Sequence, residues 1–214
     1  MNISIILSGG TGLRFGGSVP KQYAQLCGRE VIGHVIDAVV KCHLSDKTII
    51  VATTDEIPRL TDDYGIECVY AGKEHNHSVK NGLDYIKTKY PDCKKVLFVD
   101  SARPLVTSSE MDNAFNLLDS FDAVCTARFI TDSLGHNEKI YVERAEYFLI
   151  QKPEAFNFKM LYAHFSADSP TTAIIQQMPQ NARLKKTFSD SFNLKITYPD
   201  DLSLAEYLIG KRKE

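Results

Sequence analysis

The sequence predicts an α/β fold, with helices covering both faces of a mostly parallel, twisted sheet. Short runs rich in β-branched residues alternate with longer stretches in which apolar residues recur every three or four positions. This alternation is typical of consecutive βα units, which place their strands side by side in one sheet. Hydrophobic residues make up 43% of the chain and charged residues 24%, as in an ordinary globular protein with one sizeable core. We therefore expect the 214 residues to form a single domain.

The regular part of this pattern lies in the first 128 residues. Apolar runs rich in β-branched residues predict five strands, at residues 2–7, 48–52, 67–70, 95–100 and 122–128. The segments between them have helical periodicity and predict four helices, at residues 31–41, 56–64, 77–89 and 108–119.

The pattern changes after Ile130. Residues 137–150 alternate charged and apolar side chains with the period of a strand, and the helix of a further βα unit is missing. We expect an inserted antiparallel arm over about residues 131–152. Beyond it we expect helices at residues 155–166 and 171–178, a strand at 183–188, a short strand at 193–197 and a final helix to Ile209. Thr197, Pro199 and Asp200 mark the start of that helix with a hydroxyl cap, an early proline and an acid.

The charge balance excludes a general nucleic-acid-binding surface. The chain has 25 Lys and Arg against 27 Asp and Glu, a net charge of −2 and an isoelectric point near 6.3, whereas a polyanion needs a clustered basic face. Any bound anion is therefore expected to be small and held locally. No stretch approaches the roughly 18 uninterrupted apolar residues of a membrane span, and the first residues have neither a basic leader nor a cleavage site. We expect a cytoplasmic protein that binds no membrane, with its five scattered cysteines reduced.

A glycine-rich segment follows the first predicted strand. Five of the nine residues from Gly9 to Gly17 are glycines, so backbone N–H groups can turn toward one anion at the carboxyl end of the strand. Arg14 and Lys21 lie in the same loop and supply a fork-shaped donor and a point charge, as a polyphosphate requires. The simpler alternative is a flexible surface turn with solvated bases.

Two other phosphate-binding patterns fit this segment poorly. The Walker string Gly-x-x-x-x-Gly-Lys-Ser/Thr is absent. The dinucleotide fingerprint has its third glycine displaced to Gly16, and its ribose-binding acid about 20 residues further on is missing. An oxidoreductase is therefore disfavoured.

Polar residues near two other strand ends extend the candidate site. The strand at residues 95–100 ends in Asp100, and one carboxylate beside bound phosphates is a usual Mg²⁺ ligand; otherwise Asp100 caps the next turn. Gly72 and Ser78 flank the predicted start of a helix, where Ser78 either binds a base or phosphate or is a plain cap.

Four further residues carry weaker signals. His75 and His77 lack other ligands at metal-binding spacing. Arg144 and Lys195, taken alone, are ordinary surface bases.

Three motifs, in this order along the chain, carry a family resemblance. They are Leu-Ser-Gly-Gly-Thr-Gly-Leu-Arg with Pro-Lys-Gln after it, Asp-Ser-Ala-Arg-Pro, and Asn-Leu-Lys-Ile-Thr-x-Pro-Asp-Asp-Leu. Together they resemble the cytidylyltransferases that activate sugar-alcohol phosphates, whose known members use ribitol 5-phosphate or 2-C-methyl-D-erythritol 4-phosphate. The resemblance implies a Rossmann-like nucleotidyltransferase fold, CTP and a polyol phosphate as substrates, Mg²⁺, and a homodimer formed through the arm.

The resemblance also implies a role for each matching residue. Arg14 and Lys21 would stabilise the transition state, and Asp100 would bind Mg²⁺. The residues expected to hold CTP are Leu7, Ser8, Gly9, Gly10, Gly12, Gly72 and Ser78. Those expected to bind the polyol phosphate are Arg103, Ser133, Arg144 and Lys195, with Arg144 and Lys195 also catalytic. Attack by an acceptor phosphate on CTP needs positioned cations rather than a protein nucleophile.

Several residues depart from the family pattern, mainly on the acceptor side. The family usually has arginine at His75, Thr-Pro-Gln at Lys152-Pro153-Glu154, Thr-Asp near Asp168 and threonine at Ser133. The strings Asp-Ser-x-Arg-Pro and Phe-Asn-Leu-Lys-Ile-Thr favour ribitol 5-phosphate or a related alditol phosphate, for surface polysaccharide synthesis. The alternatives are 2-C-methyl-D-erythritol 4-phosphate, for isoprenoid synthesis, and a non-catalytic nucleotide-binding relative. Asp190 is either a second metal ligand or an exposed loop residue.

Overall fold

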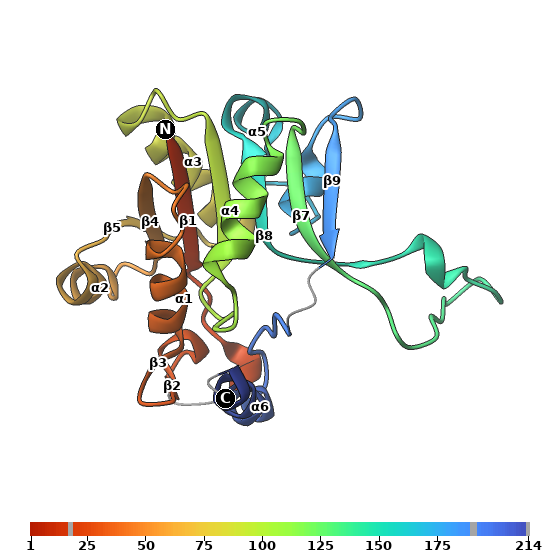
Figure 1. Ribbon diagram of the computed structural model, residues 1–214, viewed down its shortest axis with the longest axis horizontal. Coiled ribbons are helices and arrows are strands. Elements are labelled where there is room, and N and C mark those ends of the chain that lie inside the picture. Colours follow the sequence, from red (N-terminus) through yellow and green to blue (C-terminus); the bar gives the residue numbers. More distant parts are fainter. Residues whose placement is uncertain (17–18, 189–191, 213–214) are drawn as a thin grey trace.

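The computed structural model describes residues 1–16, 19–188 and 192–212. In these ranges a seven-stranded sheet has the order β5-β4-β1-β6-β8-β7-β9 (Figure 1). Its strands are β1 (Asn2–Ser8), β4 (Lys47–Ala52), β5 (Glu67–Tyr70), β6 (Lys95–Asp100), β7 (Ala123–Arg128), β8 (Leu149–Asn157) and β9 (Leu184–Phe188). A small antiparallel hairpin is formed by β2 (Gln25–Leu26) and β3 (Arg29–Glu30). The helices are α1 (Val31–Val40), α2 (Ile57–Tyr64), α3 (His75–Lys89), α4 (Ser108–Leu117), α5 (Phe158–His164) and α6 (Pro199–Arg212).

Helices cover both faces of the sheet, which confirms the predicted α/β layering. Successive side chains of a strand point to opposite faces. In β1, the side chains of Ile3 and Ile5 therefore pack with α3 and α5, whereas Ile6 packs with α1, α2 and α4. All three isoleucines are completely buried, so β1 lies at the centre of both cores.

The elements predicted up to residue 128 are all present, with ends that differ by at most two residues. Helix α4 illustrates why these ends are predictable. The Thr107 hydroxyl accepts a hydrogen bond from the Glu110 N–H at 3.3 Å, and the Glu110 carboxylate accepts one from the Thr107 N–H at 3.0 Å. This reciprocal pair satisfies two N–H groups that a helix start would otherwise leave without partners.

Strand β8 runs antiparallel to its neighbours β6 and β7, while the other six strands of the sheet are parallel to one another. The sequence predicts a helix over residues 155–166, and its first part is wrong. Ala155 and Phe156 belong to β8 and are completely buried, and α5 begins only after them. A short apolar run cannot be assigned to a central strand or a buried helix by its periodicity alone.

The segment between β7 and β8 protrudes from the body as an arm (Figure 1). Its exposed apolar side chains include Ile140 and Tyr141. The expected antiparallel pairing over residues 137–150 is wrong for most of this range. The structure gives it only the 3₁₀ turn η3 (Arg144–Glu146), and β8 begins at Leu149.

Two predicted elements of the C-terminal part are absent. Residues 171–178 contain the 3₁₀ turn η4 (Ile174–Gln177) instead of an α-helix, and residues 193–197 do not form a strand.

The C-terminal part is held against the rest of the chain by a small separate core. The N–H of Ile196 donates to the Ala102 carbonyl at 2.9 Å. Ile196 packs there with Leu26 of the hairpin and Ala205 of α6.

All five cysteines are free thiols, and Cys42, Cys93 and Cys125 are buried. Across the described ranges, the helices lack the combined length and apolar character that spanning a membrane would need.

Candidate active site

The carboxyl ends of β1 and β6 meet at one edge of the sheet, because Leu7 of β1 pairs with Asp100 of β6. There, together with the loop that follows β5, they border a cavity of about 260 Å³. Ligands of open α/β sheets bind at this edge. The lining residues are Leu7, Gly9, Gly10, Thr11, Lys21, Gln22, residues 72–75, Ser78, residues 100–102 and Lys195.

The glycine-rich loop is tightly packed at its first residue, Gly9, whereas Gly10 and Gly16 have open space beside them. A Cβ atom at Gly9 would lie 2.3 Å from the Cβ of Ala71, so only glycine fits between the two loops. The Gln22 side-chain amide donates to the carbonyls of Ser8 and Gly10, at 3.2 and 2.8 Å. These bonds turn both carbonyls toward Gln22.

The loop between β5 and α3, residues 71–74, contains Gly72 and is the second glycine loop of the site. Ser78 closes this loop. Its hydroxyl accepts a hydrogen bond from the Gly72 N–H at 3.1 Å and donates to the Glu74 carbonyl at 3.1 Å. A Cβ at Gly72 would lie 2.3 Å from the Cβ of His77. Because α3 begins at His75, two residues earlier than expected, Ser78 lies inside its first turn.

Lys21 lies where the positive charges of the site converge. Its pKa is lowered from 10.5 to about 8, first by burial and then by the nearby charges of Lys195 and Arg14, against the opposing effect of Asp100. An ammonium ion in these surroundings is destabilised until an anion binds, so the free site is prepared for a polyphosphate.

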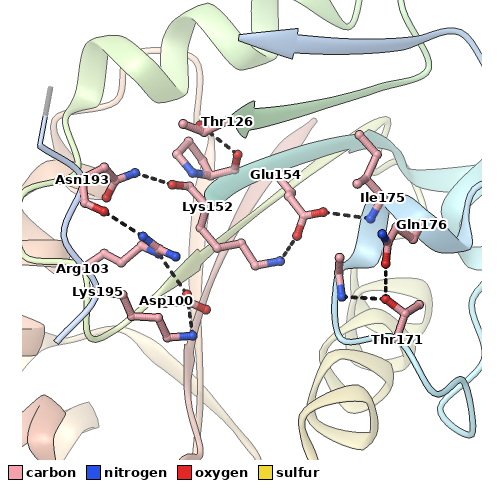
Figure 2. Close-up of polar contacts among 12 residues, drawn as sticks. Asp100, Arg103, Thr126, Lys152, Glu154, Thr171, Ile175, Gln176, Asn193 and Lys195 are labelled. Atoms are coloured by element: carbon pink, nitrogen blue, oxygen red, sulfur yellow. Dashed lines mark hydrogen bonds and ion pairs between the residues drawn. The ribbon is translucent and has the colours of Figure 1, made fainter. Parts of the chain in front are cut away.

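Asp100 is the centre of an ion-pair network in which Asp100 and Arg103 are buried and Lys195 is exposed. Its Oδ2 atom lies 3.1 Å from Nε of Arg103 and 3.0 Å from Nζ of Lys195 (Figure 2). Burial would raise the pKa of Asp100, but the charges of Lys195, Arg103 and Lys152 outweigh it and hold the pKa well below its usual range. The carboxylate is therefore ionised at any working pH.

A second cavity, of about 340 Å³, adjoins the first. His75, Asp100 and Lys195 line both cavities and form the wall between them. The other residues that line the second cavity are Arg14, Arg103, residues 150–152, Glu154, Thr172 and Ala173. Its four cationic side chains face two carboxylates, so it carries a formal excess of two positive charges, which suits a phosphate monoester.

The site fits a Mg²⁺ ion that takes most of its ligands from a bound nucleotide. Asp100 is ionised and faces both cavities. In the part of the chain that the structure describes, no three His, Cys, Asp or Glu side chains are grouped to hold a metal. Mg²⁺ in nucleotide sites is commonly held by one or two carboxylates plus phosphate oxygens, which matches this donor set.

The structure brings together most of the residues that the sequence singles out. The cavity-lining residues among them are Leu7, Gly9, Gly10, Arg14, Lys21, Gly72, Ser78, Asp100, Arg103 and Lys195. Four do not line either cavity: the Ser8 hydroxyl lies 3.3 Å from that of Tyr23, Gly12 takes a left-handed turn, and Ser133 and Arg144 lie on the arm. Asp190 lies outside the described residues.

Arg144 is exposed, and its guanidinium donates to the Thr131 carbonyl within the arm at 2.7 Å. It borders a different cavity at the base of the arm, with Phe129, Tyr147 and Phe188. Within one chain, Arg144 is therefore separate from the other predicted acceptor-binding residues.

Three lining residues have contacts that the sequence analysis does not predict. Gln22, the last residue of the Pro-Lys-Gln string, fixes the glycine-rich loop. Lys152 and Glu154 form a buried ion pair on the same cavity as Asp100, and the family departure at residues 152–154 is the one signal that points to this pair. His75 is also unusual: burial, together with the charge of Lys152, lowers its pKa to about 4, and its buried Nε2 atom has no hydrogen-bond partner among the described residues.

Comparisons with known proteins agree with this geometry. The family model for "IspD: 2-C-methyl-D-erythritol 4-phosphate cytidylyltransferase" matches residues 2–211. An enzyme of that name from Azobacteroides pseudotrichonymphae is 33% identical over 220 residues, covering 96% of this chain and 97% of the relative. One from Clostridium botulinum (strain Langeland) is 28% identical, with 98% of each chain covered.

A solved structure shares the fold over nearly the whole chain. The crystal structure of 4-diphosphocytidyl-2C-methyl-D-erythritol synthase from Anaerococcus prevotii superposes with a TM-score of 0.83 at 26% identity, covering 98% of this chain and 96% of that one. The family model, the relatives and this structure lead to one conclusion. The chain is a cytidylyltransferase of the IspD family.

Proposed function

We propose that this protein transfers the cytidylyl group of CTP to 2-C-methyl-D-erythritol 4-phosphate. An oxygen of the acceptor phosphate attacks the α-phosphorus, the bond from that phosphorus to the bridging oxygen breaks, and pyrophosphate leaves with the electron pair. The products are a CDP-alcohol and pyrophosphate. The acceptor phosphate is already anionic, so the step needs no general base.

The observation that carries this proposal is the wall shared by the two cavities. In this proposal CTP occupies the first cavity, between the two glycine loops, and the acceptor occupies the second cavity, whose lining is cationic. The reacting oxygen and phosphorus then meet beside Lys195 and Asp100. Lys21 and Lys195 neutralise the charge that builds up when two anions approach each other.

Mg²⁺ would be held by Asp100 and the triphosphate. It would supply charge neutralisation at the phosphate oxygens. Arg103, which also pairs with Asp100 and donates to the Asn193 carbonyl at 2.8 Å, keeps the carboxylate in place.

Arg144 would act from the partner subunit of a homodimer. Its place on the protruding arm is consistent with reaching another copy, and its own chain leaves it outside both cavities. We place the reaction in the cytoplasm.

The acceptor is proposed from the relatives, whose names specify 2-C-methyl-D-erythritol 4-phosphate. They support this alternative better than the ribitol 5-phosphate first expected from the motif strings. Ribitol 5-phosphate is retained as the second candidate, because the departures at Lys152, Glu154 and Asp168 fall in or near the acceptor cavity.

The test is a competition among acceptors. The protein is incubated with CTP, Mg²⁺ and equal amounts of the phosphates of methylerythritol, ribitol and glycerol, and the CDP-alcohols are identified by mass. We expect CDP-methylerythritol as the main product. CDP-ribitol instead would select the second candidate, and CTP binding without pyrophosphate release would select the non-catalytic relative.

A further inference from the structure

Lys152 lies in β8 and lines the second cavity together with Asp100, the last residue of β6. The pairing of β6 with β8 ends at Phe98 and Glu154. Beyond that pair β8 is irregular, because its pairing with β7 shifts from Cys125–Glu154 to Thr126–Gln151 and skips Lys152 and Pro153. Lys152 is therefore released from the regular ladder next to the carboxyl end of β6, where the site is built.

Glu154 fixes the Lys152 side chain. The two side chains form an ion pair, with Lys152 6% and Glu154 1% exposed (Figure 2). The other Glu154 oxygen accepts a hydrogen bond from the Ile175 N–H at 2.8 Å, which attaches the pair to η4. Charged residues are almost never this deeply buried without a partner, so Glu154 explains why Lys152 is tolerated here.

The ammonium group of Lys152 is still able to bind a ligand. It has three donors, its bond to Glu154 uses one, and the side chain lines the acceptor cavity. A fixed ammonium on that cavity is suited to a phosphate.

Electrostatics place Lys152 close to the shared wall. Its charge contributes to the low pKa of both Asp100 and His75, and those two residues line both cavities. Because the pKa of His75 is lowered to about 4, its imidazole is neutral near pH 7, and Lys152 supplies positive charge to this side of the second cavity.

We propose that Lys152 is a further binding residue for the phosphate of the acceptor, and that Glu154 is its positioning residue. This inference rests on the proposed function, because it takes the second cavity as the acceptor site. The expected ligand is a phosphate monoester dianion that binds while CTP occupies the first cavity.

The central variant is the double substitution Lys152→Thr with Glu154→Gln, which creates the usual family string Thr-Pro-Gln and leaves no unpaired buried charge. We expect it to fold and to raise KM for the acceptor about 10- to 100-fold, as for loss of a hydrogen bond between charged groups. KM for CTP should stay within about threefold. The single variant Lys152→Arg, which keeps the charge, should retain most of the acceptor affinity. The matched control is Lys185→Thr, because Lys185 is an exposed lysine on β9.

A second measurement does not depend on turnover. The first cavity is filled with the α,β-methylene analogue of CTP, and inorganic phosphate is titrated by calorimetry into the wild type, the double variant and the control. We expect phosphate binding to weaken in the double variant only. Equal phosphate affinity in all three, or a KM change for CTP as large as that for the acceptor, would overturn the proposal.

The two proposals fail in different ways. A wild type that makes no CDP-alcohol from any tested acceptor would contradict the proposed function. The phosphate titration would then still decide the role of Lys152.

Discussion

At the scale of single residues, we expect the proposed chemistry to depend most on Lys21. It lines the first cavity and has a lowered pKa, and three other charged side chains of the site, Lys195, Asp100 and Arg14, influence that pKa. Removal of its charge should leave the fold intact, since a partly buried ammonium adds nothing to the apolar core. We expect Lys21→Ala to lower turnover by about 100-fold or more. The measurement is pyrophosphate release, with circular dichroism as the control for folding; near-normal release would contradict the assignment.

The pKa of Lys21 also predicts a pH dependence. The cationic form, which we propose binds the triphosphate, is present below the folded-state pKa of about 8 and is lost as pH rises through it. We therefore expect kcat/KM for CTP to decline above about pH 8, because this parameter reports groups of the free enzyme. In Lys21→Arg the decline should move to higher pH, since guanidinium stays protonated. An unchanged profile in that variant would show that another group titrates.

Residues differ in how far the sequence alone reveals their roles. Lys21 and Asp100 belong to local strings that follow a strand or end one, so their approach to one sheet edge is predictable. Lys152 and Glu154 are recognisable only when β8 is placed between β6 and β7, because the sequence alone does not show which side chains surround them. Arg144 shows the opposite case: the family resemblance assigns it a role, but in its own chain it lies outside both cavities.

At the scale of elements, the two glycine loops contact each other so closely at Gly9 that a larger residue would separate them. Gly9→Ala would place a methyl group 2.3 Å from the Cβ of Ala71 and force the two nucleotide loops apart. We expect a loss of about 1–3 kcal/mol in the free energy of unfolding, as for overpacking, and a raised KM for CTP. Urea denaturation and steady-state kinetics measure the two effects.

Gly10→Ala is the matched control for stability, since a Cβ there meets nothing within 4 Å. If both variants lost equal stability, the contact between the loops would not be the reason for glycine at position 9.

Helices and strands are predicted correctly where local hydrophobic periodicity determines the secondary structure. The prediction fails where tertiary contacts determine it. Strands β1, β4, β5 and β6 form repeated βα units whose patterns are self-contained. Strand β8 has a buried ion pair and a proline between Leu149-Ile150 and Ala155-Phe156, and only its pairing with two neighbours makes that pattern a strand. The arm has strand-like alternation but no partner strand among the described residues.

At the scale of the whole molecule, the arm predicts complementation between two inactive variants. If the arm completes the partner's site, Lys21→Ala and Arg144→Ala should each be inactive alone. A mixed dimer has one site with both residues intact, so random exchange of subunits should restore about a quarter of the wild-type rate.

The measurement is CDP-alcohol formation after the two variants have been unfolded and refolded together, with mixed dimers quantified by native mass spectrometry. Refolding each variant separately before mixing is the control. Mixed dimers without recovered activity would contradict the role of the arm.

The segment at residues 193–197 makes the site depend on the last part of the chain to be synthesised. Lys195 is held in place through Ile196, whose small core includes Ala205 of the last helix. The glycine loops and Asp100 come from the first half of the chain, whereas Lys195, which pairs with Asp100, comes from its last 20 residues. A chain that ended short of α6 would therefore lack the packing that holds Lys195 beside Asp100.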